Sequence, residues 1–238
     1  MNQEEHTFKR FDQELAALNN TVMRMGGMVE DQIAKAMASL RDADIEGARS
    51  IVARDHVVNF LDVQADEQIM NLLALRQPMG KDLRMILSLG KTVTDLERIG
   101  DEAERIARMA IDIYSASSAP PSPRLLKDAY RMSSLATRML HDVLDALARL
   151  DVDKALEVAC CDAELDSEFQ SALRRLSTYI MEDSRNVGHA INAIFIIKSL
   201  ERIGDHSKNI AEYVIFLAKG KDVRHVSPES IDSQELDL

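Results

Sequence analysis

The sequence predicts an all-α fold made of two tandem, pseudo-symmetric three-helix bundles, with six long helices in total. Apolar residues recur every three or four positions along most of the chain, which is the period of amphipathic helices. The composition is poor in helix breakers, with nine Gly and five Pro among 238 residues. The six residues Leu96–Asp101, LERIGD, return unchanged at Leu200–Asp205, and such a repeat indicates one structural unit written twice.

Six helices are expected, three in each half. The expected ranges are 4–43, 45–75 and 82–115 in the first half, and 125–150, 154–181 and 187–219 in the second. The second and third helices are separated at Pro78, because proline cannot continue a helix. The first helix contains Gly26 and Gly27, where we expect either a bend or a close crossing with another helix. Gly100 and Gly204 lie mid-helix, and the close approach of another helix or of a metal cluster would explain them.

The chain divides near its middle. Ser117–Pro123 holds three of the five prolines and is expected to link the two halves. We therefore expect one three-helix bundle over residues 1–117, a second over 118–222, and a mobile acidic tail over 223–238.

The charge and the ends of the chain narrow the class of protein. A net charge of −11 argues against a nucleic-acid partner, because binding to phosphates requires an excess of Lys and Arg. Met1–Glu5 is polar and acidic, unlike a signal peptide, and the longest apolar run, Ala193–Ile197, is too short to cross a bilayer. The adjacent Cys160 and Cys161 cannot staple distant segments. We expect a cytoplasmic protein whose partners are cations or basic protein surfaces.

Acidic pairs four residues apart mark both halves, and side chains in this relation share one face of a helix. Glu97 and Asp101 form such a pair, as do Glu201 and Asp205 in the repeat. Aligning the second helices of the two halves adds one further polar pair to each half. The full set is Glu97, Asp101, Asp55 and Asn59 in the first half, and Glu201, Asp205, Asp162 and Asp166 in the second.

The distance of each pair from its turn predicts that the pairs meet. Antiparallel helices bring together residues equidistant from the connecting turn, and the first-half pairs centre on Pro78 while the second-half pairs centre between residues 183 and 184. Clustered carboxylates repel one another unless a cation is present. Oxygen ligands suit Mg, Ca, Mn or iron. The second site has four carboxylates and is expected to bind metal more tightly than the first, which has Asn59. His206 is a possible nitrogen ligand.

Two alternatives remain open from the residues alone. The acidic side chains can instead form ion pairs on a solvated helix face, which describes a metal-free scaffold or adaptor. The candidate ion pairs are Asp101 with Arg105, Glu104 with Arg108, Glu201 with Lys198, and Asp205 with Lys208. A carboxylate-bridged di-iron enzyme normally uses Glu-x-x-His motifs, and this sequence contains none. We therefore expect a protein that is not an enzyme.

The doubled LERIGD segment, the acidic pairs and the turn Gln77–Arg84 resemble the PhoU family of phosphate-transport regulators. The resemblance runs from about residue 8 to residue 218. It implies two similar three-helix bundles, often paired into a homodimer. It also implies multinuclear iron or zinc bound at the family's motif, an acidic residue followed four positions later by Asp. The matching pairs are Glu97 and Asp101, Asp162 and Asp166, and Glu201 and Asp205. Asn59 departs from the motif.

The function implied by this resemblance is regulatory. Members of the family link the ATPase subunit of a phosphate ABC transporter to a sensor histidine kinase, and they keep the phosphate-starvation response off when phosphate is sufficient. Such a protein would reach the membrane only through its partners.

Overall fold

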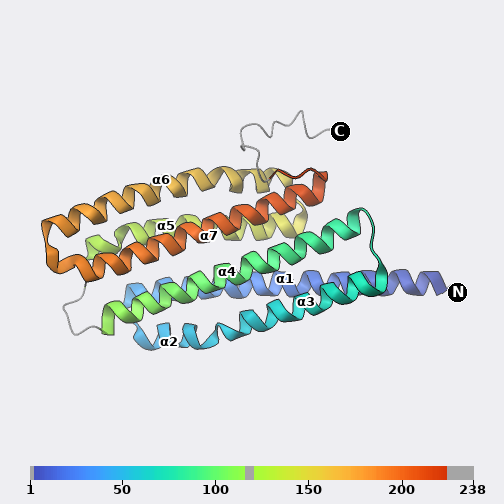
Figure 1. The fold of residues 1–238 in the computed structure, drawn as a ribbon, viewed down its shortest axis with the longest axis horizontal. Helices are drawn as coiled ribbons and strands as arrows, with labels where there is room; N and C mark the ends of the chain where they lie inside the picture. The colour runs from blue at the N-terminus through green and yellow to red at the C-terminus, as the bar shows by residue number, and fades with distance from the viewer. Residues whose placement is uncertain (1–2, 116–120, 224–238) are drawn as a thin grey trace.

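The computed structural model describes residues 3–115 and 121–223, which are helical with short connections (Figure 1). The first half contains α1 (Gln3–Asp42), α2 (Ile45–Arg54), α3 (His56–Arg76) and α4 (Lys81–Ser115). The second half contains α5 (Pro123–Arg149), α6 (Val152–Glu182), a 3₁₀ turn η1 (Ser184–Asn186) and α7 (Val187–Lys219). The described residues include no β-strand. The all-α prediction is confirmed, and each half consists of three helical rods.

The second expected helix is divided at Asp55 into α2 and α3. The imidazole Nδ1 of His56 lies 2.8 Å from the carbonyl oxygen of Ala53, an acceptor that an unbroken helix would use for its own backbone. A side chain that enters the backbone hydrogen-bond ladder is a recognised cause of helix kinks. The expected single helix over 45–75 was therefore wrong, because the segment is two helices. The prediction that this segment is helical was correct.

Helix starts follow the capping chemistry of the sequence. The Asp44 carboxylate accepts a hydrogen bond from the Gly47 amide at 2.9 Å, and Asp151 accepts one from Lys154 at 3.0 Å, so both halves cap the same helix in the same way. Pro123 opens α5, because its missing N–H is one that a first helical turn leaves unused. Pro123 therefore belongs to the helix and not to the linker.

The expected domain boundaries fall largely in undescribed parts of the chain. Residues 116–120, with the boundary at 117, lie outside the described residues, as do residues 224–238 of the expected tail. The first residue of that tail, Val223, is buried.

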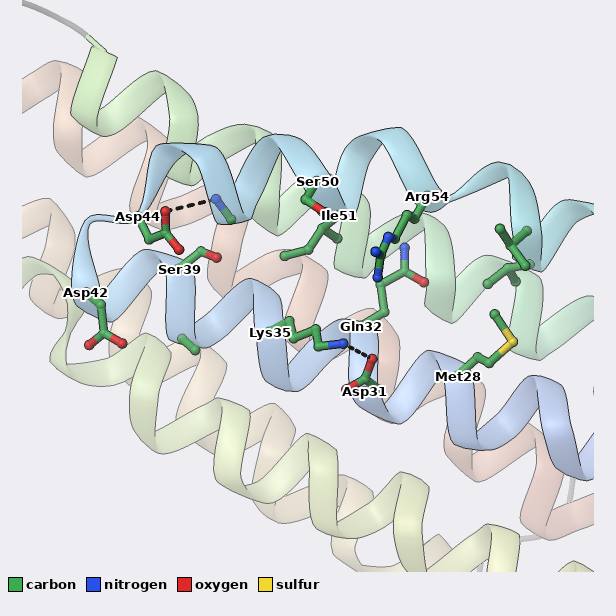
Figure 2. A pocket seen from close by; sticks show the side chains of 14 residues that line it. Met28, Asp31, Gln32, Lys35, Ser39, Asp42, Asp44, Ser50, Ile51 and Arg54 are labelled. Carbon is green, nitrogen blue, oxygen red and sulfur yellow. Dashed lines mark hydrogen bonds and ion pairs between the residues drawn. The ribbon is translucent and has the colours of Figure 1, made fainter.

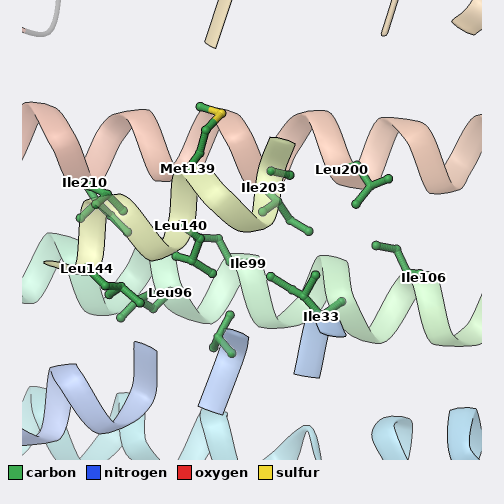
Figure 3. Packing of buried hydrophobic residues seen from close by; sticks show 14 of the residues in the cluster. Ile33, Leu96, Ile99, Ile106, Met139, Leu140, Leu144, Leu200, Ile203 and Ile210 are labelled. Atoms are coloured by element: carbon green, nitrogen blue, oxygen red, sulfur yellow. The ribbon is translucent and has the colours of Figure 1, made fainter. Parts of the chain in front are cut away.

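The centre of the molecule is the antiparallel contact between α4 and α7 (Figure 1). Helix α1 packs on α4 and helix α5 packs on α7, while α2 and α3 cover the first half and α6 covers the second. Figure 3 shows side chains from α1, α4, α5 and α7 meeting between these helices. The core there includes Ile99, Ile203, Ile33 and Leu140, all fully buried. One apolar core therefore runs through both halves.

Buried polar pairs cross this contact in a two-fold pattern. His206 Nδ1 lies 2.7 Å from Asp95 Oδ1, and Ser199 Oγ donates to Glu102 Oε2 at 2.7 Å. Asp95 and Ser199 occupy equivalent positions of the repeat, as do Glu102 and His206. Arg202 Nη1 also lies 2.5 Å from Glu102 Oε1. Burying a carboxylate requires such partners, so these pairs fix the register of α4 against α7.

The helix-interior glycines mark close approaches. A Cβ placed on Gly204 would lie 2.2 Å from Leu165 Cδ2, and one on Gly100 would lie 3.3 Å from Val58 Cγ1. These glycines admit side chains from the neighbouring helix α6 or α3, which is one of the two expected explanations. Gly26 likewise faces Leu144 of α5, whose Cδ2 would lie 2.6 Å from an added Cβ, whereas Gly27 faces open space. Helix α1 continues through both residues. Of the two expectations for these glycines, the close crossing with another helix is therefore the one that is confirmed.

The adjacent glycines of α1 give opposite predictions. Gly27→Ala should stabilise the protein by up to about 1 kcal/mol, because alanine favours an exposed helix position. Gly26→Ala should destabilise it by about 1–3 kcal/mol, because buried Leu144 must move. Urea unfolding of both variants checks this, and equal midpoints would contradict the crossing.

Candidate metal centre

Three carboxylates of the second half converge between α6 and α7. Asp162 and Asp166 extend from α6 and Asp205 from α7, and one ligand oxygen from each lies within 4.8 Å of the others. Asp162 is buried, Asp205 is half-buried and Asp166 is exposed. Among the described residues, these are the side chains of Asp, Glu, His or Cys that lie close enough together, in a group of at least three, to hold one metal ion. Three of the four residues expected in the second site are therefore brought together.

The pKa values of the group reflect this crowding. Burial, followed by the charges of Glu201, Asp162 and Asp166, raises the pKa of Asp205 to about 6 from an ordinary value of 3.8. Burial, followed by Asp162 and Glu201, also raises the pKa of Asp166. Glu201 therefore lies close enough to act electrostatically on both groups, although it is not one of the three converging ligands.

Two lysines of α7 pair with carboxylates of the second site, one in the group of three and one at Glu201. Lys208 Nζ lies 2.6 Å from Asp162 Oδ2, and Lys198 pairs with Glu201. The expected pair of Glu201 with Lys198 is confirmed, whereas Lys208 reaches across to Asp162 on α6 instead of pairing with Asp205 on its own helix. Lys198 also lies 5.3 Å from the centre of the Phe169 ring. The second site thus combines its carboxylates with two ammonium groups.

The first half surrounds its carboxylate Asp55 with amides instead of ammonium groups. Asp55 accepts hydrogen bonds from the side-chain amides of Gln32 at 3.1 Å and Asn59 at 3.2 Å. Burial, then Asp55, raises the pKa of Asp101, and burial, then Asp101 and Asp62, raises that of Glu97. Within the described residues, these carboxylates do not form a group as close as the one in the second half.

Sequence reasoning missed several side chains around the two sites. Asp62 lies near Glu97, and its spacing of seven from Asp55 was the available signal, because seven residues are two helical turns. Nothing in the periodicity pointed to Gln32 on α1. His206, expected as a possible ligand, faces Asp95 on α4 and is not in the group of three carboxylates.

Of the two remaining expected ion pairs, one is confirmed and the other has a different partner. Arg108 pairs with Glu104 at 2.6 Å, as expected. Arg105 pairs instead with Glu102 at 3.3 Å, one residue beyond the expected Asp101.

A cavity of about 540 Å³ lies between α1 and α2, away from the three carboxylates (Figure 2). Gln32 and Arg54 both extend into the space between these helices, while Lys35 is held by Asp31 at 2.5 Å. The cavity walls mix these polar groups with Met28 and Ile51. This cavity and the acidic group are therefore separate features.

The donor set of the second site fits a divalent metal. Carboxylate oxygens on two rigid helices are hard ligands that can bridge more than one ion, and burial together with the neighbouring carboxylates raises the pKa of Asp205. Fold and site together define a protein built from two copies of a helical unit, each with a carboxylate-bearing face.

The comparisons with known proteins name that class more closely. The PhoU domain model matches residues 22–110 and 129–214. The chain belongs to the PhoU family.

Relatives match nearly the whole chain. The phosphate-specific transport system accessory protein PhoU of Escherichia coli is 38% identical over 232 residues, covering 98% of this chain and 95% of its own. The PhoU homolog of Pseudomonas aeruginosa is 43% identical over 221 residues, covering 93% and 90%. These relatives are named as accessory proteins and not as enzymes. No helix within residues 3–115 and 121–223 is both long and apolar enough to span a membrane.

Solved structures agree with this fold. The crystal structure of PhoU from Pseudomonas aeruginosa has a TM-score of 0.85 and 43% identity, covering 89% of this chain and all of that one. The phosphate transport system regulatory protein PhoU from Streptococcus pneumoniae has a TM-score of 0.80 and 29% identity, covering 90% and 99%.

The raised pKa of Asp205 predicts a pH-dependent stability. A carboxyl whose folded pKa exceeds its unfolded pKa stabilises the fold below about pH 4, and this contribution is lost as pH rises through about 6. Asp205→Asn should therefore be more stable than the parent at pH 8, by about 1 kcal/mol after allowance for solvent screening, with the gap closing toward pH 4. Urea unfolding in EDTA measures this.

The control for this prediction is Asp145→Asn. A hydrogen bond from Lys154 lowers the pKa of Asp145, so its contribution is present above the ordinary pKa and lost as pH falls. Asp145→Asn should therefore be less stable than the parent at pH 8. A parent as stable as Asp205→Asn at pH 8 would contradict the crowding of the second site.

Proposed function

We propose that this protein is a cytoplasmic negative regulator of the phosphate-starvation response, which couples a phosphate ABC transporter to a sensor histidine kinase. The observation that carries the proposal is similarity along nearly the whole chain to proteins named as accessory or regulatory components of phosphate transport. The partners are the transporter's ATPase subunit and the kinase, and the protein acts as a homodimer. Association with the membrane occurs through these partners.

Metal binding is the second part of the proposal. Asp162, Asp166 and Asp205 would hold iron, zinc or another divalent ion such as Mn, Mg or Ca, with Glu201 beside them. Bound metal would supply the positive charge that offsets the repulsion between these carboxylates. In the first half, Asp55, Glu97 and Asp101 with Asn59 would form a weaker site, because one carboxylate is replaced by an amide.

A metal-free scaffold is the alternative that a specific observation favours. Lys198 and Lys208 already pair with carboxylates of the second site, and such pairs are sufficient to balance part of its charge without an ion. Regulation through protein contacts alone would then use the same helical surfaces. The two predictions that follow separate these possibilities.

Protein purified without chelator should carry transition metal, and the double substitution Glu201→Ala with Asp205→Ala should remove most of it. The equivalent change of Glu97 and Asp101 should remove less. Elemental analysis of the folded proteins measures this, with Asp145→Ala as the control because its carboxylate lies at the α5–α6 turn. Absence of metal from the parent, before and after its addition, would favour the scaffold.

Deletion of the gene should switch on phosphate-starvation genes in phosphate-rich medium, because a negative regulator has been removed. Transcript levels in the deletion strain measure this. The intact gene should restore repression, and a copy with Glu201→Ala and Asp205→Ala tests whether metal is required. Continued repression in the deletion strain would overturn the proposed role, whatever the metal content.

A further inference from the structure

The two lysines of the second site stand on either side of the repeated segment. Lys198 is three residues before Glu201 and Lys208 is three residues after Asp205, so each lies one helical turn from the acidic pair on α7. The equivalent positions of the first half are Thr94 and Glu104. The lysines are therefore a feature of the second site alone and not of the repeated unit.

Both lysines hold oxygens that a metal would need. Lys208 lies 2.6 Å from Asp162, whose side chain is 9% exposed, and Lys198 pairs with Glu201, which is 12% exposed. Ion pairs at such partly buried positions are screened less than those on an open surface. A divalent ion at the three aspartates would compete with the Lys208 ammonium for Asp162 and would repel both ammonium groups.

We propose that Lys198 and Lys208 are internal competitor cations, which offset part of the negative charge of the second site without metal and set the metal concentration at which an ion displaces them. This inference rests on the proposed metal binding.

The structure offers each displaced ammonium another location. Lys198 is 47% exposed and already lies over the Phe169 ring, so it can leave Glu201 while keeping its aromatic contact. Lys208 is four residues from Glu212 on the same helix, and the charge of Glu212 adds to the hydrogen bond with Asp162 that chiefly raises the pKa of Lys208. Displacement thus requires side-chain rotation and no movement of the helices.

The first site provides an internal comparison. Its Asp55 is held by the neutral amides of Gln32 and Asn59, which do not repel an incoming cation as an ammonium group does. Removing the lysines should therefore change metal affinity at the second site only. Asp101→Asn disables the first site and provides the background in which the second is measured alone.

Mn²⁺ titration of the metal-free full-length chain, followed by the electron paramagnetic resonance of free Mn²⁺, tests the inference. Lys198→Met and Lys208→Met keep the length of the side chain and remove its charge. Each should tighten Mn²⁺ binding at the second site roughly tenfold, and the double variant more, because a charge-assisted contact no longer competes. Lys198→Arg and Lys208→Arg keep the charge and should leave the weaker affinity of the parent.

Lys154→Met is the matched control. Lys154 is 28% exposed and pairs with Asp142 and Asp145, so it resembles Lys208 in burial and in partners but lies at the α5–α6 turn. Its loss should leave Mn²⁺ affinity unchanged. If Lys154→Met tightened Mn²⁺ binding equally, the effect would come from the net charge of the protein alone, and the inference would be overturned.

The outcomes separate this inference from the proposed function. Parent and methionine variants that bind Mn²⁺ equally would overturn the competitor role and leave metal binding intact. Binding by the variants but not by the parent would support the competitor role and contradict metal binding by the native chain. Binding by neither would contradict both.

A measurement on the unsubstituted chain tests the inference even if the variants fail to fold. Lysine acylation followed by mass spectrometry reports how accessible each ammonium group is. Mn²⁺ should increase the acylation of Lys198 and Lys208 at least about twofold, because displacement frees them from their carboxylates, while Lys154 should not change. Unchanged labelling of both lysines under saturating Mn²⁺ would overturn their displacement.

Discussion

The antiparallel contact of α4 with α7 is the constraint on which the rest of the structure depends. Glu102 is 2% exposed, and a carboxylate so deeply buried is tolerated only with close partners. Ser199 and Arg202 supply them from the other half, and Asp95 with His206 repeats the arrangement. Because α1 packs on α4 and α5 packs on α7, the register of this one contact positions both halves.

The same contact places the acidic faces. Asp101 is next to Glu102, and Asp205 is next to His206. The position of each acidic pair is therefore set by a neighbouring residue that is held across the centre. The two copies then differ in the groups that hold their carboxylates. The first surrounds Asp55 with amides, and the second pairs Asp162 with the ammonium group of Lys208. Identical LERIGD segments therefore sit in unlike electrostatic surroundings.

Much of the fold and part of the site could be predicted from the sequence. Helix periodicity, Pro78 and the repeat were sufficient for six helical rods, because these signals are local. The break at Asp55 was not predictable, since the contact of the His56 side chain with a backbone carbonyl that accompanies it leaves no mark on the apolar period. The partner of Lys208 was also missed. A flexible side chain that reaches a second helix depends on packing that spacing along one helix does not describe.

The paired register at the centre has a consequence for how the chain can change length during evolution. Asp95 and Glu102 are seven residues apart, as are Ser199 and His206, and each pair is matched in reverse order by the other. One inserted residue between the members of either pair would rotate one member off the shared face and leave buried charge without a partner. Insertions and deletions should therefore accumulate in the turns, while these seven-residue intervals stay constant in length.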